Sequence, residues 1–259
     1  MCFEFDAIPP NLPADLVIAG GAKAELLELE SADGTRFSAA FAGAAGADAN
    51  ERPAVVIYPD VRGLYPFYVQ LAERFADAGH HAIAVDYFGR TAGLGPRGED
   101  FDYAEHVPQT RSEQIQADTK AAIDAVRERT RAQKCVTVGF CFGGGESFLA
   151  GTNAELGLAG AVGFYAGLDR SSRWPQLESP KDHAADLRCP FLGLFGGADQ
   201  AIPVEMVERF DEDIDASGQE HEIVIYPGAP HSFFDRRQEE FAEASEDAWR
   251  RVLDFLTRR

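Results

Sequence analysis

A cysteine occupies the predicted corner between a strand and a helix. In the stretch Gly139-Phe140-Cys141-Phe142-Gly143, a glycine lies two residues before the cysteine and another two residues after it. Many hydrolases carry a nucleophilic serine where this stretch has the thiol. The following helix N-terminus would lower the pKa of a thiol and direct backbone N–H groups at a developing oxyanion. This chemistry is nucleophilic attack on a carbonyl. The alternative interpretation is a buried cysteine in a tight turn.

A thiol nucleophile needs a base, and the base needs an acid that orients it. Asp199 follows a predicted strand in "LFGGADQAIP", and His231 follows the next one in "YPGAPHSFFD". Ligands collect at such strand ends in open α/β sheets, and the order nucleophile, acid, histidine is that of hydrolases with this corner. Taken singly, Asp199 could be a turn residue and His231 a loop histidine. The strand-end context is missing at the other histidines: His80, His81, His106, His183 and His221.

Strand and helix patterns alternate along the chain and predict the frame that holds these residues. Apolar runs predict strands over 24–31, 35–43, 54–60, 81–88, 135–140, 158–167, 191–197 and 221–228. Helices are predicted from Phe67 to Ala78, from Ile115 to about 130, and over 142–152, 203–217 and 238–257. The alternation predicts a mainly parallel central sheet with helices on both faces.

The regions between these elements carry their own signals. Asp33-Gly34 lies between the first two strands and predicts a hairpin, which adds an antiparallel N-terminal edge to the sheet. Residues 42–53 and 89–108 are predicted loops, and the irregular stretch 168–187 is expected to cover a pocket. No internal repeat or linker is visible, so residues 1–259 are expected to form a single domain.

Composition excludes several classes of function. The formal net charge of −19 repels nucleic-acid phosphates and anionic headgroups, which argues against nucleic-acid or membrane partners. The longest apolar run, 157–168, is shorter than the roughly 18 residues of a membrane span. The opening "MCFEFDAIPPNLP" has acids where a secretory signal would carry Lys or Arg, so we expect a cytoplasmic protein. No zinc-site spacing or disulfide is expected for the cysteines: Cys2, Cys135, Cys141 and Cys189.

Together these motifs resemble the dienelactone hydrolases (carboxymethylenebutenolidases) of the α/β-hydrolase superfamily. The resemblance runs from about residue 14 to the C-terminus. It rests on "GFCFGG", "GGADQAIP", "YPGAPHSFF", and "VVIYPDVRGL" followed by "VDYFGR", with the cysteine as its diagnostic part. It implies the α/β-hydrolase fold and a catalytic triad of Cys141, Asp199 and His231.

The resemblance also implies further site residues. Asp60 stands where the best-known members have a glutamate that helps to set the ionisation of the thiol, and aspartate is one methylene shorter. The backbone N–H groups of Val61 and Phe142 would form the oxyanion hole. The family binds the carboxylate of its substrate with arginines, and Arg90 in "DYFGR" matches one of them. A loop arginine paired with nearby acids is the alternative for Arg90.

The second arginine is expected four residues after the histidine, where this chain has Asp235. An aspartate would repel a substrate carboxylate. This departure leaves the identity of the substrate undetermined, whereas the expected chemistry of the nucleophile is unaffected. Arg236 and Arg62 are the neighbouring candidates. The pocket walls are expected to include aromatic side chains that could equally belong to the core: Tyr65, Phe88, Phe142, Trp174 and Phe233.

The expected reaction is hydrolysis of a small ester or lactone through an acyl-thioester on Cys141, with no metal or organic cofactor. One alternative is a carboxylesterase or thioesterase that uses the same residues on an uncharged substrate. Another is a non-catalytic fold that senses oxidants through Cys141. The sequence leaves the oligomeric state and the natural substrate open.

Overall fold

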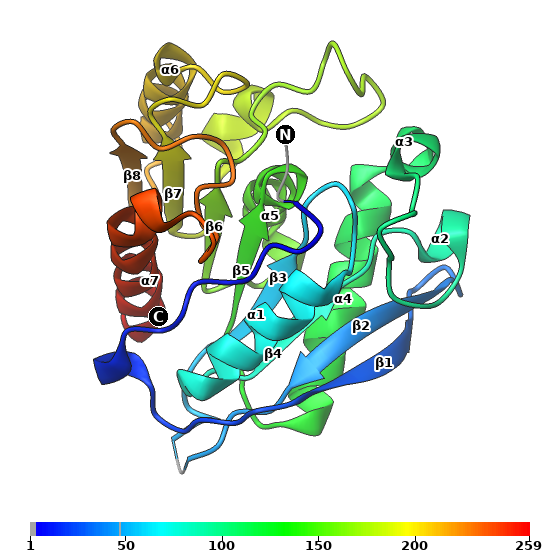
Figure 1. Ribbon diagram of the computed structural model, residues 1–259. Helices are drawn as coiled ribbons and strands as arrows, with labels where there is room; N and C mark the ends of the chain where they lie inside the picture. Colours follow the sequence, from blue (N-terminus) through cyan, green and yellow to red (C-terminus); the bar gives the residue numbers. More distant parts are fainter. Residues whose placement is uncertain (1–3, 47) are drawn as a thin grey trace.

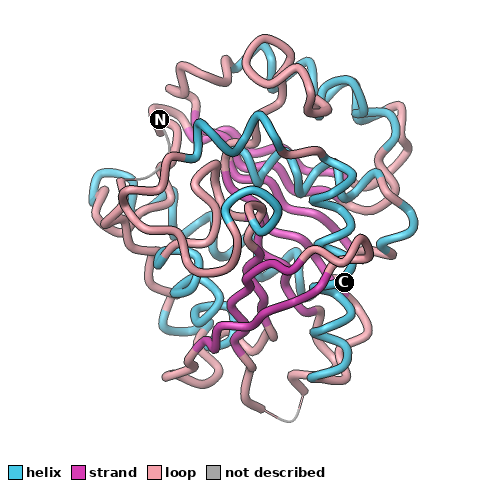
Figure 2. Tube along the Cα trace, turned by 90° about the vertical axis from the view of Figure 1, so that its right-hand side faces the viewer, coloured by secondary structure: helices cyan, strands magenta, loops and turns pink. Residues whose placement is uncertain are grey.

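One eight-stranded sheet organises the structure, a computed structural model that describes residues 4–46 and 48–259. The strand order is β1-β2-β4-β3-β5-β6-β7-β8. The parallel strands are β3 (Ala54–Tyr58), β4 (Ala82–Val85), β5 (Cys135–Phe140), β6 (Gly160–Phe164), β7 (Phe191–Gly196) and β8 (His221–Tyr226). β1 (Ala24–Glu30) and β2 (Arg36–Ala42) form the antiparallel edge. The predicted mainly parallel sheet with an antiparallel N-terminal edge is confirmed, and Figure 2 shows it running through the molecule.

The central strands are apolar throughout because both faces of the sheet are covered. In β3, Val55 and Ile57 belong to one hydrophobic cluster, whereas Ala54, Val56 and Tyr58 belong to the other. Successive side chains of a strand point to opposite faces, so a strand covered on both sides needs an apolar residue at every position. All five residues of β3 are buried.

Helices cover the sheet on both faces (Figure 1). α1 (Pro66–Asp77) and α7 (Ala242–Thr257) lie on one face, where the Phe75 ring meets Trp249 with a centroid distance of 5.1 Å. On the other face Ile123 of α4 (Ser112–Arg129) packs in the cluster of Val56. α5 (Phe142–Thr152) contacts α6 (Val204–Asp215) through Phe148. Within the described residues, no helix is both long and apolar enough to cross a membrane.

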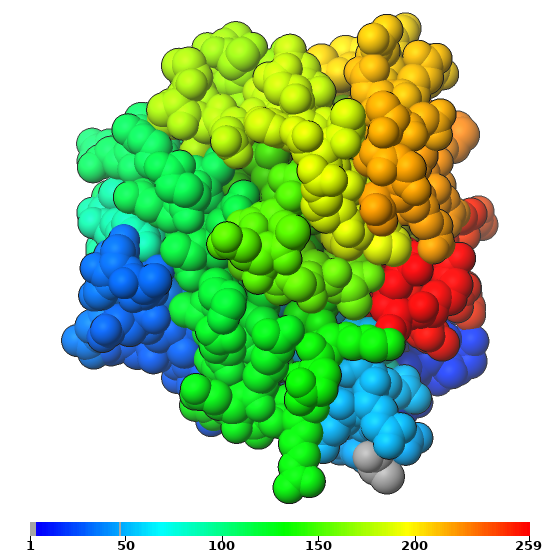
Figure 3. Space-filling model, turned by 180° about the vertical axis from the view of Figure 1, so that it is seen from behind, coloured from blue at the N-terminus to red at the C-terminus, as the bar shows by residue number. Residues whose placement is uncertain are grey.

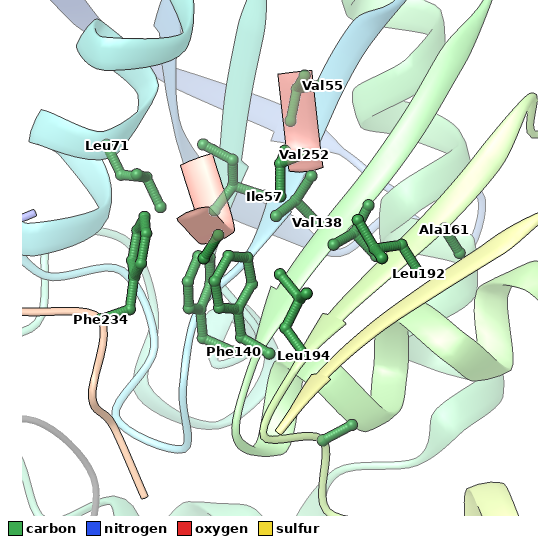
Figure 4. Close-up of a cluster of buried hydrophobic side chains, with 14 of the residues drawn as sticks. Val55, Ile57, Leu71, Val138, Phe140, Ala161, Leu192, Leu194, Phe234 and Val252 are labelled. Carbon is green, nitrogen blue, oxygen red and sulfur yellow. The ribbon is translucent and has the colours of Figure 1, made fainter. Parts of the chain in front are cut away.

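The core against α1 and α7 anchors the strand that leads to Cys141. Figure 4 shows side chains from the parallel strands and the covering segments of this core: Val55, Ile57, Val138, Phe140, Ala161, Leu192, Leu194, Leu71, Phe234 and Val252. The Phe140 ring stacks on Phe164 of β6 at 4.5 Å and lies 5.9 Å from Phe234. The residue directly before the corner is therefore held by packing from neighbouring strands.

Two predicted irregular regions contain short helices. Residues 89–108 include α2 (Gly89–Ala92) and α3 (Tyr103–His106), and 168–187 include the 3-10 helix η4 (Pro180–Asp186). Helices of one or two turns are too short to show a repeating apolar face, so periodicity could not indicate them. The last long helix begins at Ala242, after the separate 3-10 turn Glu239–Phe241. The segment between β6 and β7 lies at the top of Figures 1 and 3, beside α6.

The corner between β5 and α5 leaves no room for side chains at its two glycines. A Cβ on Gly139 would lie 1.9 Å from the carbonyl oxygen of Gly143. A Cβ on Gly143 would lie 2.1 Å from the carbonyl oxygen of Pro59, just beyond β3. Three backbone segments therefore touch at this point, and only glycine permits the contact.

We predict that Gly143→Ala lowers the melting temperature because its methyl group must displace backbone. Overpacking of this kind costs about 1–3 kcal/mol, which corresponds to roughly 2–12 °C in a chain of this size. Gly20→Ala is the matched control, since nothing lies within 4 Å of a Cβ there. Thermal unfolding followed by circular dichroism measures both. Equal melting temperatures for the two variants would contradict the predicted crowding.

Candidate active site

The backbone of Cys141 is strained. Its φ of 55° and ψ of −111° lie outside the regions that L-residues normally adopt. Among the described residues, two more non-glycine residues have positive φ: Tyr165 at 34° and Ser232 at 60°. Tyr165 follows β6 with its ring centroid 4.9 Å from that of His231, and Ser232 is the next residue after His231. Strained backbone thus gathers around one site, as is typical of functional sites.

Asp199 and His231 form a short hydrogen bond. His231 Nδ1 lies 2.6 Å from Asp199 Oδ2, and the Asp199 side chain is almost fully buried. The other carboxylate oxygen accepts the N–H groups of Ala201 at 2.8 Å and Ile202 at 3.2 Å. Asp199 is therefore both a turn residue, through the N–H groups of Ala201 and Ile202, and the hydrogen-bond partner of His231. The turn fixes the carboxylate that directs the imidazole.

His231 also forms a side-chain hydrogen bond with Cys141. Burial lowers the pKa of His231, but the negative charge of the Cys141 thiolate, the hydrogen bond to Asp199 and a hydrogen bond to Cys141 raise it to about 10. A histidine with this pKa is protonated at neutral pH. The arrangement therefore favours a thiolate–imidazolium pair in the resting site.

The oxyanion-hole candidates lie beside this corner. No acceptor within residues 4–46 and 48–259 takes the N–H of Val61 or that of Phe142. The two side chains share one hydrophobic cluster, and Phe142 is the first residue of α5. Tyr87 Oη donates to the carbonyl of Pro59 at 2.6 Å and its ring meets Phe142 edge-on at 5.3 Å. Two backbone donors thus have no acceptor among the described residues, and one of them belongs to the residue that follows Cys141.

Asp60 is fully buried within a cluster of its own loop and α1. Arg62 donates to both carboxylate oxygens, with Nη2 2.7 Å from Oδ2 and Nε 3.1 Å from Oδ1. Tyr65 Oη donates to Oδ2 at 3.0 Å, and the backbone N–H of Asp60 donates to Tyr68 Oη. Burial acts to lower the pKa of Arg62, and the hydrogen bonds and charge of Asp60 raise it. The sequence-predicted residues Asp60, Arg62 and Tyr65 therefore come together as one cluster.

A cavity of about 240 Å³ opens onto the candidate nucleophile. Cys141, Phe142 and His231 line it together with Trp174, whose ring meets Phe142 edge-on at 5.6 Å. The remaining wall comes from the segment after β6 and from the turn after Asp199: Gly167, Leu168, Asp169, Arg170, Ser172, Arg173, Ala201 and Ile202. A cavity of this size suits a small molecule with an apolar body.

Other predicted binding residues lie outside this cavity. Arg90 pairs with Asp33 at 2.9 Å and with Asp118 at 2.5 Å. Arg236 donates to Asn11 at 2.9 Å. Phe88 and Phe233 are fully buried among other rings, Phe88 against Phe101 and Phe233 between Tyr165 and Tyr226. Among the sequence-predicted wall aromatics, Phe142 and Trp174 line the cavity.

Asp235 has a structural role that its position in the sequence did not reveal. Its carboxylate accepts the N–H groups of Ile8 at 3.1 Å and Arg237 at 3.0 Å. The N-terminal segment is thereby tied to the loop after β8, and Trp249 Nε1 donates to Pro10 in the same region. The acidic residue that departs from the resemblance holds this segment in place.

The structure brings in charged residues that the sequence reasoning missed, and Asp169 of the cavity wall is one of them. Arg170 and Arg173 line the cavity, and Glu146 of α5 is fully buried beside Arg170. Two sequence signals pointed this way. Glu146 is the lone charge in the apolar segment "FGGGESFLAGT", and both arginines lie in the irregular stretch expected to cover a pocket.

Cys135 and Cys189 are sheltered from this chemistry because both are buried. Burial raises the pKa of Cys135 to about 11 and that of Cys189 to about 12. Cys2 lies outside the described residues. Within the described part of the chain, no group of three or more His, Cys, Asp and Glu side chains is arranged to hold a metal ion.

Comparison with known proteins gives consistent matches over most of the chain. The model of the "Dienelactone hydrolase family" matches residues 38–259. Proteins named "Putative carboxymethylenebutenolidase" are 30% identical over 208 residues in Methylorubrum extorquens and 31% over 214 residues in Escherichia coli. These alignments cover 79% of this chain, with 71% and 76% of the relatives.

Solved structures match as well. The crystal structure titled "Putative Dienelactone Hydrolase" from Klebsiella pneumoniae has a TM-score of 0.77 and 28% identity, covering 91% of this chain and 100% of its own. An esterase of Pyrococcus furiosus has a TM-score of 0.68 at 16% identity, covering 96% of this chain and 98% of its own. At 16% identity, the similarity to the esterase shows only a shared fold, the α/β-hydrolase fold.

We predict that Cys141 reacts with iodoacetamide at a nearly constant rate between about pH 6 and pH 9. The raised pKa of His231 keeps the imidazolium paired with the thiolate, and the pair is lost only as the pH rises through about 10. His231→Gln should make the rate rise steeply toward the ordinary thiol pKa of about 8.5. Mass spectrometry of the Cys2→Ser protein isolates the signal, and a wild-type rate that rises tenfold per pH unit would refute the pairing.

Proposed function

The chain belongs to the dienelactone hydrolase family and is a hydrolase of lactone or ester bonds, and on this premise we propose that Cys141, Asp199 and His231 are its catalytic triad. The observation that carries the proposal is the connected set of bonds from Asp199 through His231 to Cys141, at the wall of a cavity. The substrate is a small ester or lactone, which is cleaved through an acyl-thioester.

In the first half of the reaction the Cys141 thiolate attacks the carbonyl carbon of the substrate. The carbonyl oxygen becomes an oxyanion, which accepts the N–H groups of Val61 and Phe142. The tetrahedral intermediate then collapses, the C–O bond to the leaving alcohol breaks, and His231 gives its proton to that alcohol. For a lactone, the alcohol stays attached as the other end of the opened ring.

In the second half, acylation changes the acidity of His231. Two of the causes that raise its pKa, the charge of Cys141 and the hydrogen bond to Cys141, end when the sulfur becomes a neutral thioester. Burial then lowers the pKa of His231, and only the hydrogen bond to Asp199 and the negative charge of Asp199 still raise it. Having lost its proton to the leaving group, His231 accepts one from water, and the hydroxide releases the acid and restores the thiolate.

The cavity offers one arginine for a substrate carboxylate. The Arg173 guanidinium lies 4.6 Å over the Trp174 ring, is exposed, and has no carboxylate partner among the described residues. Nearby, Asp169 pairs with Lys181 at 2.7 Å and bonds to Ser171, which offsets its charge. We therefore assign the binding of an anionic substrate group to Arg173, whereas Arg90 stays engaged by its two aspartates.

A carboxylesterase for uncharged substrates is the second candidate. Leu168, Trp174 and Ile202 give the cavity an apolar wall that would accept such a substrate without Arg173. The two candidates share the triad and differ only in the group that is recognised.

We predict that Cys141→Ala abolishes hydrolysis, with kcat/KM for p-nitrophenyl acetate falling at least about 1,000-fold because no covalent step remains. A stopped reaction of wild type should show the acyl group on Cys141 by mass spectrometry. Cys135→Ala is the control and should leave the kinetics unchanged. If Cys141→Ala keeps wild-type turnover, the triad is wrong. If wild type has no esterase activity while Cys141 is oxidised reversibly by peroxide, the redox-sensing alternative replaces it.

We predict that Arg173→Met separates the two substrate classes. Loss of the guanidinium should raise KM for an ester with a free carboxylate about tenfold, which is about 1.4 kcal/mol. The KM for the methyl ester of the same compound should change less than about twofold. Steady-state kinetics on the matched pair measures both. Equal effects on the two substrates would favour the uncharged class.

A further inference from the structure

A buried ion pair lies directly behind the corner that carries Cys141. Arg170 Nη1 lies 2.5 Å from Glu146 Oε1, and the two side chains are 2% and 0% exposed. Burial raises the pKa of Glu146, and the charge of Arg170 opposes this effect. Glu146 lies in the second turn of α5, and Arg170 comes from the segment that follows β6.

Arg170 also contacts Phe142, the residue that follows Cys141, in two ways. Its Nη2 donates to the carbonyl of Phe142 at 2.6 Å, and its guanidinium carbon lies 4.8 Å over the Phe142 ring. The fit is close, since a Cβ on Gly145 would lie 2.2 Å from Nη2. The glycine run after Cys141 therefore makes room for this guanidinium.

The same arginine anchors the cavity wall. Its backbone N–H donates to Ser179 Oγ at 2.9 Å, and its carbonyl accepts the N–H of Trp174 at 2.8 Å. The Trp174 ring in turn packs edge-on against Phe142. Arg170 thus joins the wall of the cavity to the first turn of α5.

Stability alone does not account for this pair. Taking two charges out of water carries a large desolvation cost, and apolar replacements of buried pairs are often neutral or stabilising. Here the pairing is incomplete, because Glu146 Oε2 and Arg170 Nε have no hydrogen-bond partner among the described residues. An ion pair with unpartnered polar atoms contributes little to the stability of the fold. It does hold the two side chains, and the groups that they contact, in one arrangement.

We propose that Arg170, held in place by Glu146, is a positioning residue that orients Phe142 so that its N–H meets the oxyanion. The inference rests on the proposed function, because the N–H of Phe142 matters only if an oxyanion forms there. The carbonyl and ring of Phe142 are both held by one rigid guanidinium, which leaves its backbone little freedom to turn. Donors fixed before the reaction need no reorganisation as the negative charge develops.

The test is Arg170→Lys, which keeps the charge but replaces the fork with a single ammonium. A lysine cannot span Glu146 and the Phe142 carbonyl as the guanidinium does. We expect kcat for p-nitrophenyl acetate to fall about tenfold or more, with KM within about twofold. A trifluoromethyl ketone, which forms an oxyanion on Cys141, should bind more weakly by the same factor. The binding of the acid product should not change.

The matched control is Arg251→Lys. Arg251 also donates to two carboxylates, Asp247 at 2.6 Å and Glu222 at 2.5 Å, on the surface of α7 and β8. Its replacement should leave kcat, KM and inhibitor binding unchanged. The Cys141 alkylation profile should be the same in all three proteins, because the thiolate–imidazolium pair is not altered.

A double variant covers the case in which Arg170→Lys folds poorly. Glu146→Leu with Arg170→Met replaces the pair by apolar groups of similar size and should retain the melting temperature. A purely structural role predicts wild-type kcat in this variant, whereas positioning predicts the same loss as in Arg170→Lys. Wild-type kcat and inhibitor affinity in either folded variant overturn the inference. If wild type forms no acyl-thioester, the proposed function fails instead.

Discussion

The close contact of three backbone segments at Gly139, Gly143 and Pro59 is the constraint on which the site depends. It forces Cys141 into its strained conformation and brings the end of β3 against the start of α5. Cys141 lies at this corner and lines the cavity, and the N–H groups of Val61 and Phe142 have no acceptor among the described residues. The strain at one residue is sustained by the packing of Phe140 between neighbouring strands.

The buried charged groups of the site are a second feature, and hydrogen bonds or ion pairs hold each of Asp199, Asp60 and Glu146. Asp199 is fixed by two backbone amides and directs His231, while Asp60 is enclosed by Arg62 and Tyr65. Such groups are costly to bury alone, so they occur as connected sets. The pKa of His231, raised to about 10 by a charge that acylation would remove, connects the electrostatics of the resting site to the order of the proposed steps.

Much of the frame was readable from local signals. The Asp33-Gly34 hairpin, the apolar strands and the long helices were predicted because each depends on residues close in the sequence. The short helices in 89–108 were missed because one turn has no repeating apolar face. The partners of Arg90 were also hidden, since Asp33 and Asp118 lie 57 and 28 residues away along the chain. The presence of an arginine at a motif position does not indicate which carboxylates pair with it in the folded protein.

The sequence by itself determined the fold class and the candidate residues at the strand ends, because the order of strands places Cys141, Asp199 and His231 on the same edge of a parallel sheet. Only the tertiary structure decided the distances between them and which other side chains share the cavity. Arg170 and Glu146 meet behind Cys141 although 24 residues separate them, and Asp235 turns to the N-terminal segment 227 residues away. Ion pairs and hydrogen bonds of this kind depend on atoms within about 3 Å of each other, and residue spacing along a chain does not encode that proximity.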